Sequence, residues 1–288
     1  GYELGLDLAL RNGDDLERKK ILHISGGTTE EERDQLELFT RSYEVISEGP
    51  ELGAISTLIT KDGNDENVVD QTQTEFIINQ TNRGINMVSY LGHGASNVLE
   101  IDIGSPESYN IPNHKYPAYY FSGCLLSNTY NENPSTGEKY ILAEDNGALV
   151  WTSETSFGLI QTLHQYTLSL YDNLFKEHYG ERMGDVLRET GEDFMNETPI
   201  TSRDMQVLQK MLVGDPSVKL FHPLQPDYLT RNNEVFFIPQ EANAEEDSIA
   251  ISFAIRNPGR AIEDTLTISV SHTLPNFSTK SYSVKVPC

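Results

Sequence analysis

Two residues of this 288-residue chain combine reactive side chains with matching surroundings. His93 stands between two glycines after the apolar run 86–91, and Cys124 follows Ser122-Gly123 at the end of the apolar run 118–122. A thiolate is a strong nucleophile toward a carbonyl carbon, and an imidazole can give a proton to a departing amine near neutral pH. Together the two side chains are suited to attack on a peptide carbonyl and proton transfer to the departing amine.

The glycines beside these residues serve a second purpose. They leave backbone N–H groups accessible, so the N–H groups of Gly94 and Cys124 are predicted to bind the oxyanion of a tetrahedral intermediate. Each reactive residue alone also has an ordinary interpretation, since a histidine between glycines can be a turn residue and a lone cysteine can fill the core. The pair favours the catalytic interpretation, because both residues stand at strand ends.

The surrounding sequence predicts the elements that position these residues. Short apolar runs alternate with amphipathic stretches over the first two thirds of the chain, which indicates a mainly parallel sheet with helices on both faces. His93 and Cys124 are then expected at the carboxyl ends of two strands, where reacting groups collect in open α/β sheets. The predicted strands lie at residues 20–27, 54–59, 86–91, 118–122 and 147–151, and the predicted helices at residues 28–43, 67–81, 139–144, 160–178 and 183–195.

The sequence changes character near Pro223. A proline-rich loop is followed by strand-length runs with a turn-forming cluster at residues 256–260 between the second and third of them. This spacing predicts an immunoglobulin-like β-sandwich over residues 223–288, and we expect it to be truncated because four strands do not complete such a fold. The four predicted strands lie at residues 235–238, 249–255, 265–270 and 281–286.

The composition restricts the classes of partner and cofactor. The chain has 44 acidic and 21 basic residues, and the resulting formal charge of −23 disfavours nucleic acid and anionic membrane surfaces as partners. It has two cysteines, Cys124 and Cys288, which cannot form a disulfide framework and have no metal-ligand spacing. We therefore expect no nucleic-acid partner and no required cofactor.

The two strand ends resemble a known group of enzymes. A His-Gly after one short apolar strand and a small-small-Cys motif after the next are typical of the clan that includes caspases, legumains, separases and gingipains. Within it the chain resembles the gingipain-type cysteine peptidases, whose strand-end Gly-His-Gly corresponds to Gly92-His93-Gly94. Three further blocks agree with this family: Gly137-Glu138 opening a helix, Gly147-Ala148-Leu149 entering a strand, and Val213-Gly214-Asp215-Pro216 closing the domain.

The resemblance implies a caspase-like or gingipain-like peptidase domain over residues 1–222, without the additional N-terminal subdomain that such proteins carry. It implies a cysteine endopeptidase in which Cys124 forms the acyl-enzyme and His93 protonates the leaving group. The N–H groups of Gly94 and Cys124 would hold the oxyanion. No motif selects a third catalytic residue among the many carboxylates.

The same resemblance locates the substrate pocket in residues 152–158. Ser156 and Phe157 are predicted to line it, and Glu154 is predicted to select a basic side chain. Phe157 also fits an ordinary surface aromatic, and a glutamate such as Glu154 is usually only solvated. The preferred substrate side chain therefore stays open.

Similarity to the PorU-type signal peptidases of the type IX secretion system bears on location. It implies a secreted or cell-surface protein, associated with the outer membrane, that acts on secreted polypeptides and has the outer-membrane secretion machinery as a partner. A structural calcium ion is implied by the family likeness alone. The acidic residues Asp102, Glu107, Asp215 and those of the run 62–66 form no EF-hand pattern.

Two alternatives stay open. One is a catalytically silent gingipain-like module for binding or adhesion at the cell surface, against which the retention of both His93 and Cys124 argues. The other is transpeptidation, in which an acceptor amine instead of water attacks the acyl-enzyme. Hydrolysis and transpeptidation use the same pair of residues, so the sequence does not distinguish these two reactions.

Overall fold

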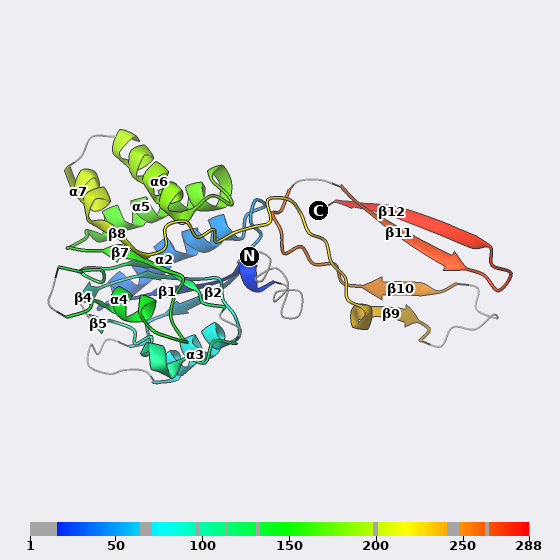
Figure 1. Cartoon of the computed structure of the whole chain (residues 1–288), viewed down its shortest axis with the longest axis horizontal. Coiled ribbons are helices and arrows are strands. Elements are labelled where there is room, and N and C mark those ends of the chain that lie inside the picture. The colour runs from blue at the N-terminus through cyan, green and yellow to red at the C-terminus, as the bar shows by residue number, and fades with distance from the viewer. Residues whose placement is uncertain are drawn as a thin grey trace.

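The computed structural model describes residues 16–63, 71–95, 98–112, 115–130, 133–197, 201–240, 248–262 and 265–287. Within these ranges a six-stranded sheet lies between two layers of helices, and two β-hairpins extend from one end of this α/β unit (Figure 1). None of the described helices is both long and apolar enough to cross a membrane.

The large sheet is mainly parallel, as the sequence predicts. Its strands are β1 (Lys20–Ser25), β2 (Ile55–Thr60), β3 (Met87–Leu91), β6 (Ala118–Ser122), β7 (Val150–Glu154) and β8 (Lys210–Gly214), in the spatial order β2-β1-β3-β6-β7-β8. The first five run parallel, and β8 pairs antiparallel with β7. The order places β1 and β3 side by side at the point where the connections reverse direction, which is where ligands bind in open α/β sheets.

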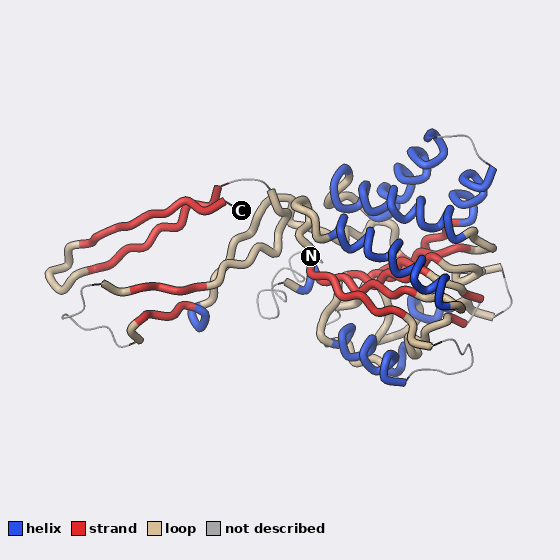
Figure 2. Tube along the Cα trace, turned by 180° about the vertical axis from the view of Figure 1, so that it is seen from behind, coloured by secondary structure: helices blue, strands red, loops and turns tan. Residues whose placement is uncertain are grey.

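Helices cover both faces of this sheet. α2 (Glu30–Ser47), α5 (Ile160–Asp172), α6 (Met183–Glu197) and α7 (Thr201–Gln209) lie on one side, and α3 (Gln71–Asn82) and α4 (Thr136–Ile141) lie on the other (Figures 1 and 2). A five-residue π-helical segment, Asn173–Glu177, continues α5. The arrangement confirms the predicted fold class.

The core consists of two apolar layers, one on each face of the sheet. Successive strand residues alternate between them, so that Met87 packs beneath α2 and α5 while its neighbour Val88 packs beneath α3. On the α3 face, aromatic rings from β6, β7 and α4 pack together, with the ring centroids of Phe121 and Trp151 4.6 Å apart. This packing makes the strands a rigid base for the loops at their carboxyl ends.

Two differences from the predicted elements bear on the site. α7 and β8 are absent from the sequence prediction, because β8 is a half-buried edge strand without an alternating pattern. β7 begins at Val150 and not at residue 147. The N–H of Ala148 bonds to the carbonyl oxygen of Tyr140 in α4, and that of Leu149 bonds to Pro117, just before β6. The strand ends at Glu154, three residues beyond its predicted end, because its pairing with β8 continues to that residue.

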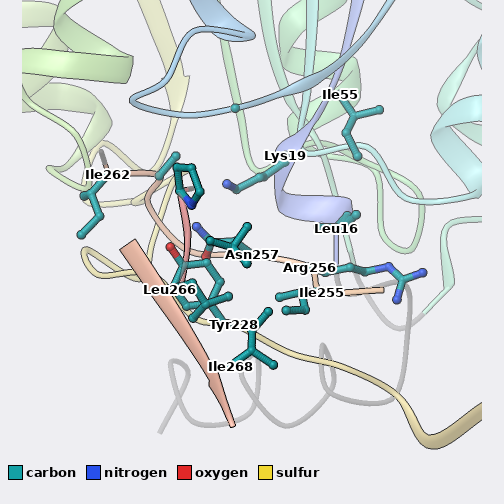
Figure 3. Close-up of a pocket in the computed structure, with 14 residues that line it drawn as sticks. Leu16, Lys19, Ile55, Tyr228, Ile255, Arg256, Asn257, Ile262, Leu266 and Ile268 are labelled. Atoms are coloured by element: carbon teal, nitrogen blue, oxygen red, sulfur yellow. The ribbon is translucent and has the colours of Figure 1, made fainter. Parts of the chain in front are cut away.

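The hairpins correspond to the predicted β-region. β9 (Val235–Ile238) pairs with β10 (Ala250–Phe253), and β11 (Thr265–Thr273) pairs with β12 (Thr279–Pro287), in both cases antiparallel. These small sheets are compatible with part of an immunoglobulin-like domain, and the boundary at residue 223 stays a prediction. A pocket of about 500 Å³ lies near the start of β1 and β2 (Figure 3). Its lining includes Lys19 and Ile55 together with Leu266 and Ile268.

Two leucines of α2 test the assignment of the core. Leu36 is fully buried in the layer beneath α2, whereas Leu38 is 67% exposed on the same helix. We expect Leu36→Ala to lower the free energy of unfolding by about 2–5 kcal/mol, since it removes buried methyl groups and leaves a cavity. Leu38→Ala is the matched control and should change it by no more than about 0.5 kcal/mol. Urea denaturation of both variants measures the difference, and equal effects would contradict the described orientation of α2.

Candidate active site

The carboxyl edge of the sheet carries both predicted catalytic residues. β3 and β6 pair in parallel with Met87 opposite Ala118 and Leu91 opposite Ser122. The N–H of Gly92 donates to the carbonyl of Ser122 at 3.2 Å, so the pairing continues past the last strand residues. Extended by two positions, this register sets His93 opposite Cys124.

The loops that carry these residues pack directly against each other. A β-carbon placed on Gly94 would lie 3.0 Å from the carbonyl oxygen of Cys124, and one placed on Gly123 would lie 3.0 Å from the carbonyl oxygen of Gly92. Such distances are tighter than nearly all real contacts of a β-carbon. The glycines therefore serve the close approach of the two loops, in addition to the exposure of N–H groups that the sequence suggested.

His93 has a carboxylate partner. Its Nε2 atom lies 2.8 Å from Oε1 of Glu32, and its side chain is 46% exposed. A neutral imidazole that donates its Nε2–H to Glu32 keeps Nδ1 free as an acceptor. The pair thus fixes both the orientation of the ring and the nitrogen that is available for proton transfer.

Glu32 is itself held by the start of α2. Thr29 caps this helix by accepting a hydrogen bond from the N–H of Glu32, and Oε2 of Glu32 accepts from the N–H and the hydroxyl of Thr28 at 2.8 and 2.7 Å. One carboxylate oxygen therefore completes the helix cap while the other contacts His93. The positive end of the helix dipole further favours a negative charge at this position.

These contacts keep Glu32 ionised. Burial alone would raise the pKa of Glu32, but the hydrogen bonds from Thr28 and the contact with His93 outweigh it and lower the pKa from 4.5 to about 2. The carboxylate is therefore negative throughout the range in which a histidine titrates. It can stabilise the imidazolium that forms when His93 takes a proton.

The sequence did not identify Glu32. Its helix cap and acidic first turn were visible at residues 28–32, but three consecutive glutamates compete for the role there. The pairing of β1 with β3 brings the start of α2 to His93, and the side-chain contact with the imidazole then selects Glu32. A glutamate at the third position of a helix after a glycine turn was the available signal.

Cys124 sits in a constrained turn. Its sulfur accepts a hydrogen bond from the N–H of Gly158 at 3.4 Å and lies 3.8 Å from the carbonyl oxygen of the same residue. The next residue, Leu125, has φ +64°, a left-handed conformation that non-glycine residues rarely adopt. Hydrogen bonds from the N–H of Leu125 to Ser156 and from that of Ser127 to Glu154 pin this turn to the end of β7.

The predicted oxyanion donors lie on the same two loops. Gly94 begins the short strand β4 (Gly94–Ala95), which pairs with β5 (Val98–Leu99). Among the described residues, no hydrogen-bond acceptor contacts the N–H of Cys124. The assignment of both N–H groups to an oxyanion site stays a prediction.

Glu154 does not fit its predicted role in substrate selection. It is fully buried, and its Oε2 accepts a hydrogen bond from the N–H of Gly123 at 3.0 Å. Its Oε1 pairs with the ammonium of Lys210 and accepts from Gln206 at 2.9 Å. Both carboxylate oxygens therefore have partners within the protein. The residue supports the turn before Cys124 and does not face a substrate.

The lysine partner is also buried and remains charged. Burial would lower the pKa of Lys210, but Glu154 and the hydroxyl of Tyr120 outweigh this and raise it above its ordinary value. The ammonium lies 4.6 Å from the ring centroid of Tyr120 and 5.1 Å from that of Tyr166. The ion pair thus joins β8 to the turn that carries Cys124, through the contact of Glu154 with the N–H of Gly123.

The other two predicted pocket residues are accessible. Ser156 is exposed, and Phe157 is 72% exposed beside the residue whose N–H contacts the Cys124 sulfur. Their role in substrate binding stays a prediction. Among the described residues, no three His, Cys, Asp or Glu side chains are grouped so as to hold a metal ion. Residues 64–66 of the acidic run 62–66 lie outside the described residues, and the structural calcium ion stays a prediction.

Comparison with known proteins decides the family. The model of peptidase family C25 matches residues 8–221. The chain belongs to peptidase family C25. This is the gingipain family of cysteine peptidases, so the resemblance drawn from the strand-end motifs is confirmed. No curated protein matches the sequence.

Solved structures of this family share the fold. The chain matches gingipain R, described as an Arg-specific cysteine proteinase, with a TM-score of 0.60 and 13% identity, over 93% of this chain and 61% of that one. It matches the complex of the pro- and mature domains of Porphyromonas gingivalis RgpB with a TM-score of 0.59 and 15% identity, over 98% and 73%. At these identities the likeness establishes the fold alone, and the chain spans 61% of the length of the gingipain R chain.

The lowered pKa of Glu32 predicts a dependence of stability on pH. A carboxylate whose pKa is lower in the folded than in the unfolded protein contributes stability above the unfolded pKa, and this is lost as the pH falls through the folded pKa. The melting temperature of Glu32→Gln should therefore lie below that of the wild type above pH 4.5, and the difference should shrink as the pH falls toward about 2.

Thermal melts of the wild type and variant across this range measure the effect. Glu31→Gln is the matched control, because Glu31 is an exposed neighbour in the same helical turn. A difference between wild type and Glu32→Gln that stays constant with pH would contradict the assigned contacts.

Proposed function

We propose that this chain is a cysteine endopeptidase that cleaves polypeptides through Cys124 and His93. The observation that carries the proposal is the 2.8 Å contact between Nε2 of His93 and Oε1 of Glu32, on the edge where the register sets His93 opposite Cys124. Membership of peptidase family C25 supports the same chemistry. Glu32 enters this proposal as a positioning residue, since it acts through His93.

The geometry supports a two-step reaction. The thiolate of Cys124 attacks the carbonyl carbon of the peptide bond, and the N–H groups of Gly94 and Cys124 bind the resulting oxyanion. The imidazolium of His93 gives its Nδ1 proton to the amine, which leaves as the C–N bond breaks, and a thioester remains. His93 then takes a proton from water, the hydroxide attacks the thioester, and the thiolate departs with release of the acid.

Transfer to an amine acceptor uses the same thioester. In that reaction the acceptor amine replaces water, so the contacts of His93 and Cys124 are unchanged. Product analysis in the presence of a competing amine distinguishes the two reactions, because only transfer yields the amide of the added amine.

The setting of the reaction follows from the likeness to secretion-associated signal peptidases. As part of the same proposal, the enzyme acts on secreted polypeptides at the cell surface, beside the outer-membrane secretion machinery. Fractionation of cells that express a tagged full-length protein tests this location, and recovery in the cytoplasm alone would contradict it.

Covalent labelling tests the proposed pair of residues. A peptide acyloxymethyl ketone should label Cys124 of the wild type rapidly, and His93→Ala should slow the labelling by about a hundredfold or more, because general acid–base catalysis contributes at least that much. Intact-mass spectrometry over time measures the rates, with Cys124→Ala as the blank.

His178→Ala is the matched control, since Nδ1 of His178 lies 3.2 Å from a glutamate oxygen on a distant loop. It should label at the wild-type rate. Wild-type labelling no faster than that of a free thiol, and unchanged in His93→Ala, would instead favour the silent binding module.

The buried ion pair of Glu154 predicts a loss of rate without a change of selectivity. Glu154→Gln should lower kcat/KM by about tenfold or more for peptides with basic and with apolar side chains alike, because it disturbs the turn that carries the nucleophile. Phe157→Ala is the comparison variant, and it should change the ratio of the two kcat/KM values, since its exposed side chain directly precedes Gly158, whose N–H contacts the thiol. A selective loss of the basic peptides in Glu154→Gln would restore the original assignment of Glu154.

A further inference from the structure

We infer that Glu100 is a further positioning residue, whose buried carboxylate fixes the backbone of His93 to the loop that leads into the helix of Glu32. The inference rests on the proposed function, because it concerns the geometry of the same imidazole. Glu100 follows the short strand β5 and lies seven residues beyond His93 in the sequence. It contacts no reacting atom, so its effect would be exerted through His93 and Glu32.

A single carboxylate oxygen joins the loops after β1 and β3. Oε2 of Glu100 accepts hydrogen bonds from the N–H of His93 at 2.8 Å and from the N–H of Gly27 at 3.0 Å. Gly27 directly precedes Thr28, which holds Glu32. The oxygen therefore ties the backbone of the imidazole to the backbone that orients its carboxylate partner.

Tyr90 binds the other backbone polar group of His93, its carbonyl oxygen. Its hydroxyl donates to the carbonyl oxygen of His93 at 2.6 Å and lies 3.3 Å from Oε2 of Glu100. The backbone N–H and C=O groups of His93 are thus both bonded to buried side chains. This leaves the imidazole ring as the part of the residue that faces solvent.

Two neighbouring glycines leave the space that this carboxylate occupies. A β-carbon on Gly26 would lie 2.1 Å from Oε2 of Glu100, and one on Gly92 would lie 2.7 Å from it. Any larger residue at either position would displace the oxygen. Glycine at Gly92, which the sequence motif includes, and at Gly26 is therefore explained in part by the space that Glu100 occupies.

The charge of Glu100 is buried with a lysine. The side chains of Glu100 and Lys61 are 8% and 5% exposed, with Nζ of Lys61 3.9 Å from Oε1 of Glu100. Oε1 has no hydrogen-bond partner among the described residues. A buried ion pair gives little net stability, whereas loss of one partner leaves a costly unpaired charge. A group of this kind is better explained by the geometry that it fixes than by stability.

The test compares two variants that differ only in the acceptor. Glu100→Gln/Lys61→Met keeps an oxygen at this position without either charge, and Glu100→Ala/Lys61→Met removes the oxygen as well. The readout is the second-order rate of Cys124 alkylation by iodoacetamide as a function of pH, which needs no knowledge of the substrate. Melting temperatures are measured alongside.

We expect the variant with alanine to lose the dependence of alkylation on His93 and to react about ten- to a hundredfold more slowly near neutral pH, because a displacement on the order of 1 Å can cost that much. The variant with glutamine should keep a pH profile like that of the wild type. Glu17→Gln/Lys115→Met is the matched control, since this similarly buried pair lies before β1 and β6 at the opposite edge of the sheet. It should change the melting temperature without changing the profile.

Wild-type alkylation that is unaffected by His93→Ala would overturn the proposed function and this inference together. Alkylation that depends on His93, but has the same pH profile in the wild type and the alanine variant, would overturn this inference alone. If the alanine variant does not fold, Glu100→Asp provides the test, because the shorter side chain keeps the charge but cannot reach both N–H groups. A wild-type profile in Glu100→Asp would then contradict the inference.

Discussion

The arrangement of His93 and Cys124 at the carboxyl edge of the sheet depends on the parallel register between β3 and β6. Because Leu91 pairs with Ser122 and the N–H of Gly92 bonds to the carbonyl of Ser122, His93 and Cys124, two positions beyond this pair, lie on adjacent loops at the same edge. A shift by one residue would turn alternate side chains to the opposite face. Phe121 and Trp151 pack in the aromatic core on the α3 face of the sheet, and such a shift of β6 would remove Phe121 from it. This packing therefore stabilises the register.

The sequence was sufficient for those features that follow from local pattern. Apolar runs ending in glycine predicted β3 and β6 to within one residue, and with them the reactive pair at their ends. Features that depend on contacts between distant segments were not accessible. Glu32 lies in the first turn of α2, beside Glu30 and Glu31. Only its contacts with His93 and Thr28, which require β1 to lie beside β3, distinguish it from these neighbours.

The reassignment of Glu154 shows how a small error in a strand boundary changes a functional interpretation. Ending the predicted strand at residue 151 left Glu154 in a loop, where its carboxylate could face a substrate. In the structure the strand begins at Val150, and Glu154 pairs with Lys210 of a strand that has no alternating pattern. The residue remains part of the site, but its contact is the N–H of Gly123.

The backbone at His93 and the backbone just before Cys124 are held by the same kind of contact. Glu100 accepts the N–H of His93 and lies near Lys61, while Glu154 accepts the N–H of Gly123, directly before Cys124, and pairs with Lys210. In each case a buried carboxylate reaches the backbone at a strand end, where regular sheet pairing no longer fixes it. A charged acceptor bonds more strongly to a backbone N–H than a neutral one. Each carboxylate also pairs with a buried lysine, so these contacts hold the two loops in place while the His93 side chain stays exposed and that of Cys124 stays partly exposed.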